Sequence, residues 1–160
     1  MSEIRFWWVR HAPVIGNNGC CYGNNDVDCD VSDIESYKIL ADILPKNSYT
    51  YSSHLTRTIK TMEASIKEGF KYQDYKIEKN FGEQNLGEWQ GLKYEKLAET
   101  TKELNVFHPT WLCDPKYSPP GGESYNNLFN RVSSGIQDIM ESRKEGDIVI
   151  FSHGGPIKAA

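Results

Sequence analysis

The segment Ile4–Val9 has the sequence IRFWWV and is followed at once by Arg10-His11-Ala12-Pro13. Its aromatic and β-branched residues are typical of a buried strand. In an open α/β sheet, ligands bind at the carboxyl ends of the strands, and an arginine there offers a planar fork of donors to an anion. Taken alone, Arg10 and His11 are more often charged loop residues, so the rest of the chain has to decide between a loop and a site.

Two further strands end in similar residues. Asp147–Phe151 is the clearest buried strand and runs into Ser152-His153-Gly154-Gly155-Pro156. The short strand Tyr49–Tyr51 precedes Arg57, which we expect in the first turn of a helix. Basic residues are favoured at the other end of a helix, so an arginine in this position indicates a function.

The remaining patterns predict helices and one more strand. Ser32-Asp33-Ile34-Glu35 resembles a capping box that opens a helix to about Leu44. Its expected apolar stripe is Ile39, Leu40, Ile43 and Leu44. A second helix is expected after the Ser52–Thr58 segment and up to about Lys67, and a third strand at Lys76–Glu78. Two more helices are expected, one over Lys93–Leu104 and one from the cap Ser124 to about Lys144. In the longest helix, the expected apolar positions are Tyr125, Leu128, Phe129, Val132, Ile136, Ile139 and Met140.

This order of elements predicts an α/β fold of three layers (α/β/α), with a mostly parallel central sheet. We expect residues 1–160 to form a single domain. With 25% charged and 38% hydrophobic residues, the composition is that of an ordinary globular protein. The net charge of −4 gives no basic surface for nucleic acid. No apolar run approaches the roughly 20 residues of a membrane span, and no signal peptide is evident, so we expect a cytoplasmic protein without a membrane partner. The sequence leaves open whether the protein forms a homodimer.

Metal and disulfide patterns are weak. Cys20, Cys21, Cys29 and Cys113 form no CxxC pair, which favours free thiols in a reducing compartment. The segment Asp26–Asp30 alternates carboxylates like a calcium loop, but it lacks the glycine and glutamate of an EF-hand. We therefore expect no metal site and no cofactor.

The residues at the strand ends suit phosphoryl transfer without a metal. Two guanidiniums can neutralise the transferring group, a histidine can attack it in line, and an acid can protonate the leaving alkoxide. A carboxylate for that last step is available in the glycine-flanked loop Phe81–Gly91, as Glu83. We expect these groups to line one cleft at the carboxyl edge of the sheet.

Four ordered segments resemble motifs of the histidine phosphatase superfamily, whose members include phosphoglycerate mutases. They are Val9-Arg10-His11, Ser52-Ser53-His54-Leu55-Thr56-Arg57-Thr58, the block from Glu83 to Gly91, and Ser152-His153-Gly154-Gly155. The resemblance implies a phosphoglycerate mutase-like fold, with His11 as the nucleophile that forms a phosphohistidine. It implies that Glu83 is the general acid and base, and that the phosphoryl oxygens are bound by Arg10, Arg57, His153 and Asn17.

The chain departs from the family pattern at two places. Ala12 replaces the usual glycine, and Pro13-Val14 stand where Glu followed by Ser or Thr is common. One phosphate donor is thereby lost, and a mutase reaction is less favoured. Family members also continue past the second histidine motif, whereas this chain stops at Ala160. Either the domain is truncated at its C-terminus, or its sheet lacks a final cover.

The loop His108–Gly122 is short, which resembles the phosphatase branch, particularly α-ribazole phosphatases. We therefore predict a metal-independent phosphomonoesterase that acts on a small phosphorylated metabolite. The alternatives are a cofactor-dependent phosphoglycerate mutase and, in another class, a catalytically inactive phosphate-binding module. Trp111, Leu112 and Tyr117 either line a substrate pocket or pack within the loop.

Overall fold

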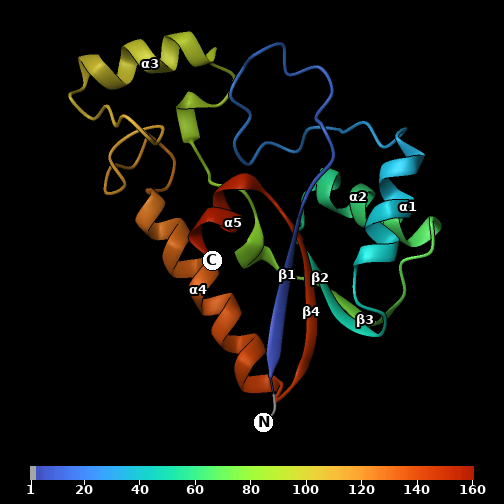
Figure 1. Ribbon diagram of the computed structural model, residues 1–160. Coiled ribbons are helices and arrows are strands. Elements are labelled where there is room, and N and C mark those ends of the chain that lie inside the picture. Colours follow the sequence, from blue (N-terminus) through green and yellow to red (C-terminus); the bar gives the residue numbers. More distant parts are fainter. Residues whose placement is uncertain (1–2) are drawn as a thin grey trace.

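A computed structural model describes residues 3–160 and contains one four-stranded sheet (Figure 1). Its strands, in the spatial order β1-β4-β2-β3, are all parallel. They span Ile4–Arg10 (β1), Ser48–Ser52 (β2), Tyr72–Ile77 (β3) and Gly146–Ser152 (β4). The expected α/β class with a parallel sheet is confirmed. That residues 1–160 are one domain stays a prediction, and Met1 and Ser2 lie outside the described residues.

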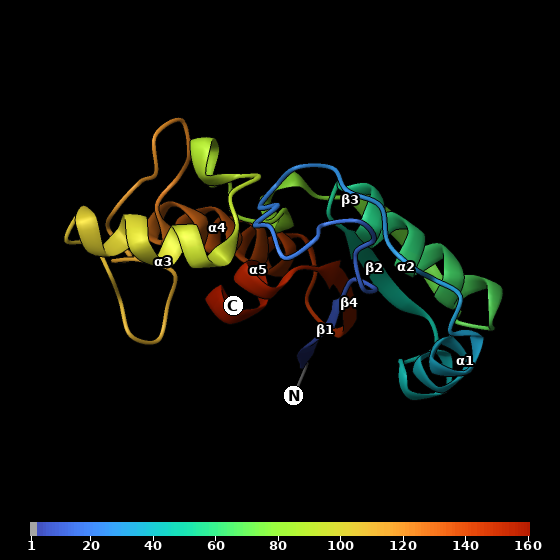
Figure 2. The same cartoon turned by 90° about the horizontal axis from the view of Figure 1, so that it is seen from above.

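Helices cover both faces of the sheet, as the three-layer prediction requires (Figure 2). One face carries α1 (Ile34–Ile43) and α2 (Thr56–Lys67), and the other carries α4 (Tyr125–Ser142) and α5 (Gly154–Ala159). Beyond the carboxyl ends of the strands lie α3 (Tyr94–Glu103) and the long loop that follows β1 (Figure 1). Two short 3-10 helices, η1 (Lys79–Phe81) and η2 (Gly87–Trp89), lie in the segment between β3 and α3.

The central strand β4 divides the core between these two layers. Ile148 and Ile150 belong to the apolar cluster on the α4 face, whereas Val149 and Phe151 belong to the cluster on the α2 face. All four side chains are fully buried. Because successive side chains of a strand point to opposite faces, an unbroken apolar run is what a strand covered on both sides needs.

The first strand is less buried than its sequence suggests. β1 lies at an edge of the sheet, and only Val9 within it is buried. Trp7 and Trp8 are half-buried, and the Trp7 indole N–H donates to Asp147 Oδ1 at 2.9 Å. The prediction of a buried strand was wrong here because β4, rather than β1, occupies the centre. The other edge strand, β3, is longer than the expected Lys76–Glu78 and is exposed throughout.

Helix ends follow their caps, with one correction. Ser124 caps α4 through a capping box with Asn127, as expected from the serine. The N-cap of α1 is Asp33, whose Oδ1 accepts a hydrogen bond from Ser36 N, so the prediction of Ser32 as the cap was wrong. A carboxylate is also the better acceptor at the positive end of a helix.

Four predicted apolar core positions were also wrong. Ile39 and Ile43 of α1 are exposed, as are Phe129 and Met140 of α4. The buried side of α1 follows residues at i, i+4 and i+7, namely Tyr37, Ala41 and the C-cap Leu44, so the prediction of Leu44 as a core position is confirmed. The small side chain of Ala41 packs with Val149 and Phe151 of β4 and lets the helix lie close to the sheet. The orientation of each helix is therefore set by packing, which the apolar residues alone do not specify.

The segment between α3 and α4 contains no helix or strand, in agreement with its prolines. Within it, Cys113, Leu112 and Tyr117 pack with Leu86 and Trp89 in a separate apolar cluster. No helix within residues 3–160 combines the length and the hydropathy needed to cross a membrane.

Candidate active site

The two motif histidines lie side by side at the carboxyl edge of the sheet. Arg10, the last residue of β1, is in register with Ser152, the last residue of β4, so His11 and His153 leave the sheet at the same level. The backbone N–H of His11 donates to the carbonyl of Ser152 at 3.0 Å, and the two imidazole centroids are 5.1 Å apart. The parallel register therefore brings together residues that are far apart in the sequence.

One nitrogen of His11 is committed and the other is free. Nδ1 lies 2.7 Å from the carbonyl oxygen of Ala12, and a carbonyl only accepts, so Nδ1 carries the hydrogen and Nε2 the lone pair. Within residues 3–160, buried Nε2 has no hydrogen-bond partner. Burial lowers the pKa of His11 to about 4, and the charges of Arg57 and Arg10 add to this effect. His11 is therefore a neutral imidazole near pH 7, with an unengaged basic nitrogen.

The imidazole of His153 is held at both nitrogens. Arg57 Nε donates to Nδ1 at 3.2 Å, so Nδ1 is an acceptor. The hydrogen of the neutral ring is then on Nε2, which donates to Ser53 Oγ at 2.7 Å. Burial and the charge of Arg57 lower the pKa of His153 well below its ordinary value. This ring is thus a neutral group that is locked in one tautomer.

The guanidinium of Arg57 is completely buried in the first turn of α2. Besides His153, it donates to the carbonyls of Asn25 at 2.8 Å and Gly23 at 2.9 Å. The ring of Tyr22 lies over it, with the ring centroid 5.1 Å from Cζ. Three of its five N–H groups are engaged, which leaves two for a ligand. Carbonyl groups solvate the charge, and no carboxylate of residues 3–160 forms a salt bridge with it.

Glu83 lies in the loop after η1, and its carboxyl group is held by backbone donors. Oε1 accepts hydrogen bonds from Gly155 N at 3.2 Å and from Gln84 N at 2.9 Å. The loop itself is fixed by Arg131 of α4, which donates to the Glu83 carbonyl at 3.0 Å and pairs with Glu123 at 2.7 Å. Burial raises the pKa of Glu83 despite these contacts. Oε2 has only the longer contact with Gly155 N, at 3.5 Å, among the contacts of residues 3–160, so Oε2 is the oxygen more available to carry a proton.

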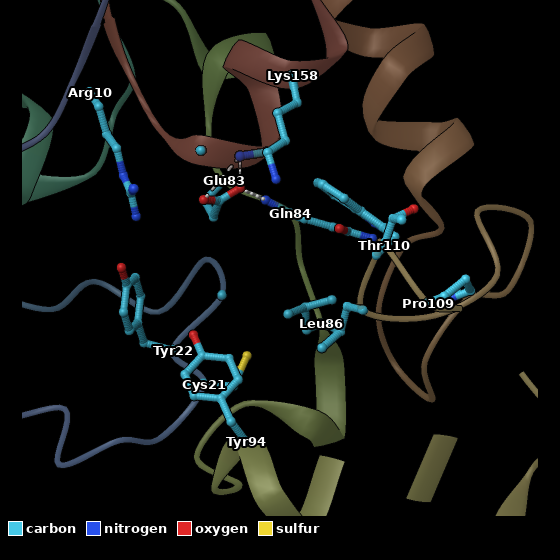
Figure 3. Close-up of a pocket in the computed structure, with 15 residues that line it drawn as sticks. Arg10, Cys21, Tyr22, Glu83, Gln84, Leu86, Tyr94, Pro109, Thr110 and Lys158 are labelled. Carbon is cyan, nitrogen blue, oxygen red and sulfur yellow. Dashed lines mark hydrogen bonds between the residues drawn. The ribbon is translucent and has the colours of Figure 1, made fainter. Parts of the chain in front are cut away.

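Beside these groups is a pocket of about 480 Å³ (Figure 3). Arg10 and Glu83 line it together with Tyr22, Trp111, Leu112 and Lys158. Trp111 and Leu112 are thus pocket residues, whereas Tyr117 packs in the loop and stacks on Trp89 with ring centroids 5.6 Å apart. The volume is within the range of sites for small molecules.

The predicted site residues are placed in two groups. Arg10 and Glu83 line the pocket, and the buried side chains of His11, Arg57 and His153 form the network next to it. Asn17 lies in the loop after β1 and is not among the pocket residues, and its backbone carbonyl accepts from Cys20 N. The functional roles of all six residues stay predictions.

Several residues of this site were missed from the sequence. Ser53 was present in a quoted motif and could have been found as the partner of the second histidine. Tyr22, Lys158 and Arg131 carried no local signal, because their contacts are made with distant parts of the chain. No group of three or more metal-ligating side chains is found in residues 3–160.

Comparisons with known proteins show several relatives of this chain. Phosphoserine phosphatase 1 of Hydrogenobacter thermophilus is 30% identical over 160 residues, which cover 98% of this chain and 74% of that protein. A metal-independent phosphoserine phosphatase of Arabidopsis thaliana is 26% identical, over 94% of this chain and 64% of that protein. A bifunctional protein of Mycobacterium tuberculosis is 34% identical over 85 residues, which are 53% of this chain and only 22% of that protein.

Among solved structures, a candidate α-ribazole-5′-P phosphatase of Escherichia coli superposes with a TM-score of 0.76. The superposition covers 97% of this chain and 76% of that one, and at 21% identity it bears on the fold alone. The family model for the histidine phosphatase superfamily (branch 1) matches residues 6–160. The chain therefore belongs to the histidine phosphatase superfamily, branch 1.

Proposed function

We propose that this protein is a metal-independent phosphomonoesterase that acts on a small phosphorylated metabolite through a phosphohistidine. The observation that carries the proposal is the state of His11: a neutral ring with Nδ1 bound to the Ala12 carbonyl and Nε2 free of any partner in residues 3–160. A nucleophile needs such a lone pair. The phosphatase relatives support the reaction class.

In the first half-reaction, the Nε2 lone pair of His11 attacks phosphorus and forms a P–N bond. The P–O ester bond breaks, and its electron pair leaves on the alkoxide, which takes the proton from Glu83 Oε2. The raised pKa of Glu83 favours the acid form that this step needs. Arg10 and the two remaining N–H groups of Arg57 bind the phosphoryl oxygens. Guanidiniums aimed at the transferring group supply the charge stabilisation.

In the second half-reaction, the Glu83 carboxylate takes a proton from water while the water oxygen attacks phosphorus. The P–N bond breaks, its electron pair returns to Nε2, and inorganic phosphate is released. The N–H groups of Gly155 and Gln84 stabilise the carboxylate form between the two steps. One carboxyl group thus serves as acid and then as base.

Access to His11 involves the segment that carries Tyr22. Nε2 is shielded from solvent, and the Tyr22 ring lies edge-on to the imidazole, with centroids 6.4 Å apart. The same ring covers Arg57. For a phosphoryl group to reach both, the Tyr22 ring has to move away from them when substrate binds. Tyr22 lies in the loop between β1 and α1, where such adjustments are least costly.

The test is a screen of phosphate release from small phosphomonoesters in the presence of EDTA, including phosphoserine, ribazole phosphate and phosphoglycerates. We expect release by the unmodified protein, its loss in His11→Ala, and an acid-labile phosphoenzyme after rapid quenching. If the unmodified protein releases no phosphate without metal, the proposal fails and an inactive phosphate-binding module is left. If it converts 3-phosphoglycerate to 2-phosphoglycerate with 2,3-bisphosphoglycerate present, it is a mutase instead.

A further inference from the structure

The side chain of Gln90 joins two loops beside the candidate active site. Its Oε1 accepts hydrogen bonds from the backbone N–H groups of Asn24, at 2.9 Å, and Leu86, at 3.2 Å, and its Nε2 donates to Asn25 Oδ1 at 2.9 Å. The two asparagines belong to a turn, residues 22–25, in the long loop after β1. Leu86 belongs to the segment between β3 and α3 that carries the candidate general acid. These two segments lie side by side beyond the carboxyl ends of the strands (Figure 1).

The same turn supplies the carbonyls that hold Arg57. The guanidinium donates through Nη2 to Gly23 and through Nη1 to Asn25. Each terminal nitrogen then keeps one free N–H, and these two are the donors left for a phosphoryl group. Because a guanidinium is planar and rigid, the positions of the two carbonyls fix the direction of both free donors. Gln90 is bonded to Asn24, between those carbonyls, and to the side chain of Asn25.

Gln90 also packs directly against the turn. A Cβ at position 23 would overlap Gln90 Oε1, and Gly23 has a φ of +46°. Glycine meets both conditions, since it has no Cβ and tolerates a positive φ. The preceding residue, Tyr22, places its ring over Arg57. The glutamine thus supports from outside the turn that encloses the guanidinium with two carbonyls and a ring.

The turn has separate anchors at its two ends. Backbone hydrogen bonds tie Cys21 to the segment after η2, and Asp26 accepts from Thr56 N at 2.7 Å at the start of α2. Between these anchors, every hydrogen bond from the turn to another segment of residues 3–160 involves either Gln90 or the enclosed guanidinium. Without the glutamine, the middle of the turn is free to shift and to take both carbonyls with it.

We propose that Gln90 is a positioning residue for Arg57: it holds the turn so that the two free N–H groups of Arg57 point at the phosphoryl oxygens. The inference rests on the phosphomonoesterase activity proposed above and adds a residue that the mechanism does not use. Gln90 has no role in binding the phosphoryl group itself. Its effect on the reaction therefore depends on the presence of the arginine.

A double-mutant cycle tests this dependence. Gln90→Met keeps the size of the side chain and removes its polar atoms. We expect it to lower kcat/KM for 4-nitrophenyl phosphate at least about tenfold, because small misplacements of a catalytic group are costly. In an Arg57→Lys background the fork to the carbonyls is already lost, so the same substitution should change kcat/KM by less than about twofold. A purely structural role of Gln90 would give equal losses in the two backgrounds.

Three further variants complete the design. Gln90→Glu still accepts from the two backbone N–H groups, and the Asn25 amide can turn so that Nδ2 donates to the carboxylate, so kcat/KM should stay within about threefold. Asn25→Ala removes one of the three contacts and keeps the carbonyl that binds Arg57. It is the milder variant if Gln90→Met does not fold, with an expected loss of about threefold that also disappears in Arg57→Lys. Gln137→Met, on an exposed position of α4, is the control for the substitution itself and should have no effect.

Equal losses from Gln90→Met in the two backgrounds overturn the inference, and so does an unchanged kcat/KM in the protein with Arg57. A loss in Gln90→Glu as large as that in Gln90→Met overturns it as well, because the accepted hydrogen bonds would then have no role. If no ester releases phosphate, the proposed activity itself has failed. The dissociation constant of inorganic phosphate, measured by calorimetry on the four proteins of the cycle, then still tests the inference. It should rise in Gln90→Met only where Arg57 is present.

Discussion

The substitution Gly155→Ala tests how tightly Glu83 is held. The backbone N–H that donates to Glu83 is kept, and only a Cβ is added. That Cβ would overlap Glu83 Oε1, while on another side Leu128 Cδ2 already stands 3.1 Å away. Ordinary contact begins at 3.4 Å, so the carboxyl oxygen has to retreat by about 1 Å, a misplacement that costs on the order of a hundredfold in rate.

The assay separates the two roles of Glu83. With an alkyl phosphate, whose leaving group needs a proton, we expect kcat to fall about a hundredfold, or about 2.7 kcal/mol in activation free energy. With 2,4-dinitrophenyl phosphate the leaving group needs no proton, so the first turnover stays fast. A burst of dinitrophenolate should then precede slow steady-state turnover, because water activation is still impaired.

The neighbouring glycine supplies the control. A Cβ at Gly154 would meet its nearest neighbour, Arg10 Cζ, at 3.9 Å, which is ordinary contact. We expect Gly154→Ala to retain kcat within about threefold, because the added Cβ displaces no group of the site. Unimpaired kcat in Gly155→Ala with the alkyl ester would refute the assignment of Glu83 as the acid, provided that thermal unfolding shows both variants folded.

Three further predictions concern the buried network. Because burial keeps His11 neutral in the folded protein, with its pKa lowered to about 4, the unfolded chain binds more protons below pH 6.5. The free energy of unfolding should therefore fall by about 3 kcal/mol from His11 alone as the pH drops from 7 to 4. Urea titrations at several pH values measure this change, and a free energy of unfolding that does not vary with pH would contradict the prediction. Ser53→Ala leaves the Nε2 hydrogen of His153 without an acceptor, so we expect a loss of about 1–3 kcal/mol in urea unfolding; a loss below about 0.5 kcal/mol would contradict the assigned tautomer. Arg57→Lys keeps the charge but loses the fork to Gly23, Asn25 and His153, and kcat/KM should fall at least about tenfold; retention of activity would show that charge alone is enough.

Much of the fold follows from local patterns. The unbroken apolar run of β4 predicts a strand covered on both faces, and the serine at position 124 predicts the start of α4; both are confirmed. These features depend on neighbours within a few residues, which is why the sequence reveals them. The aromatic residues of β1 gave a wrong prediction of burial, because an edge and a central strand have the same local preferences.

The sequence by itself determined the chemical groups and their order: two strand-end histidines, two arginines and a glutamate between glycines. Only the tertiary structure decided how these groups are held. The tautomer of His153 depends on Arg57 and Ser53, and the proton-bearing oxygen of Glu83 depends on Gly155. The physical reason is that each contact joins segments that the chain brings together only through the order and register of its sheet. The position of Lys158 in the pocket wall was likewise decided by the tertiary structure.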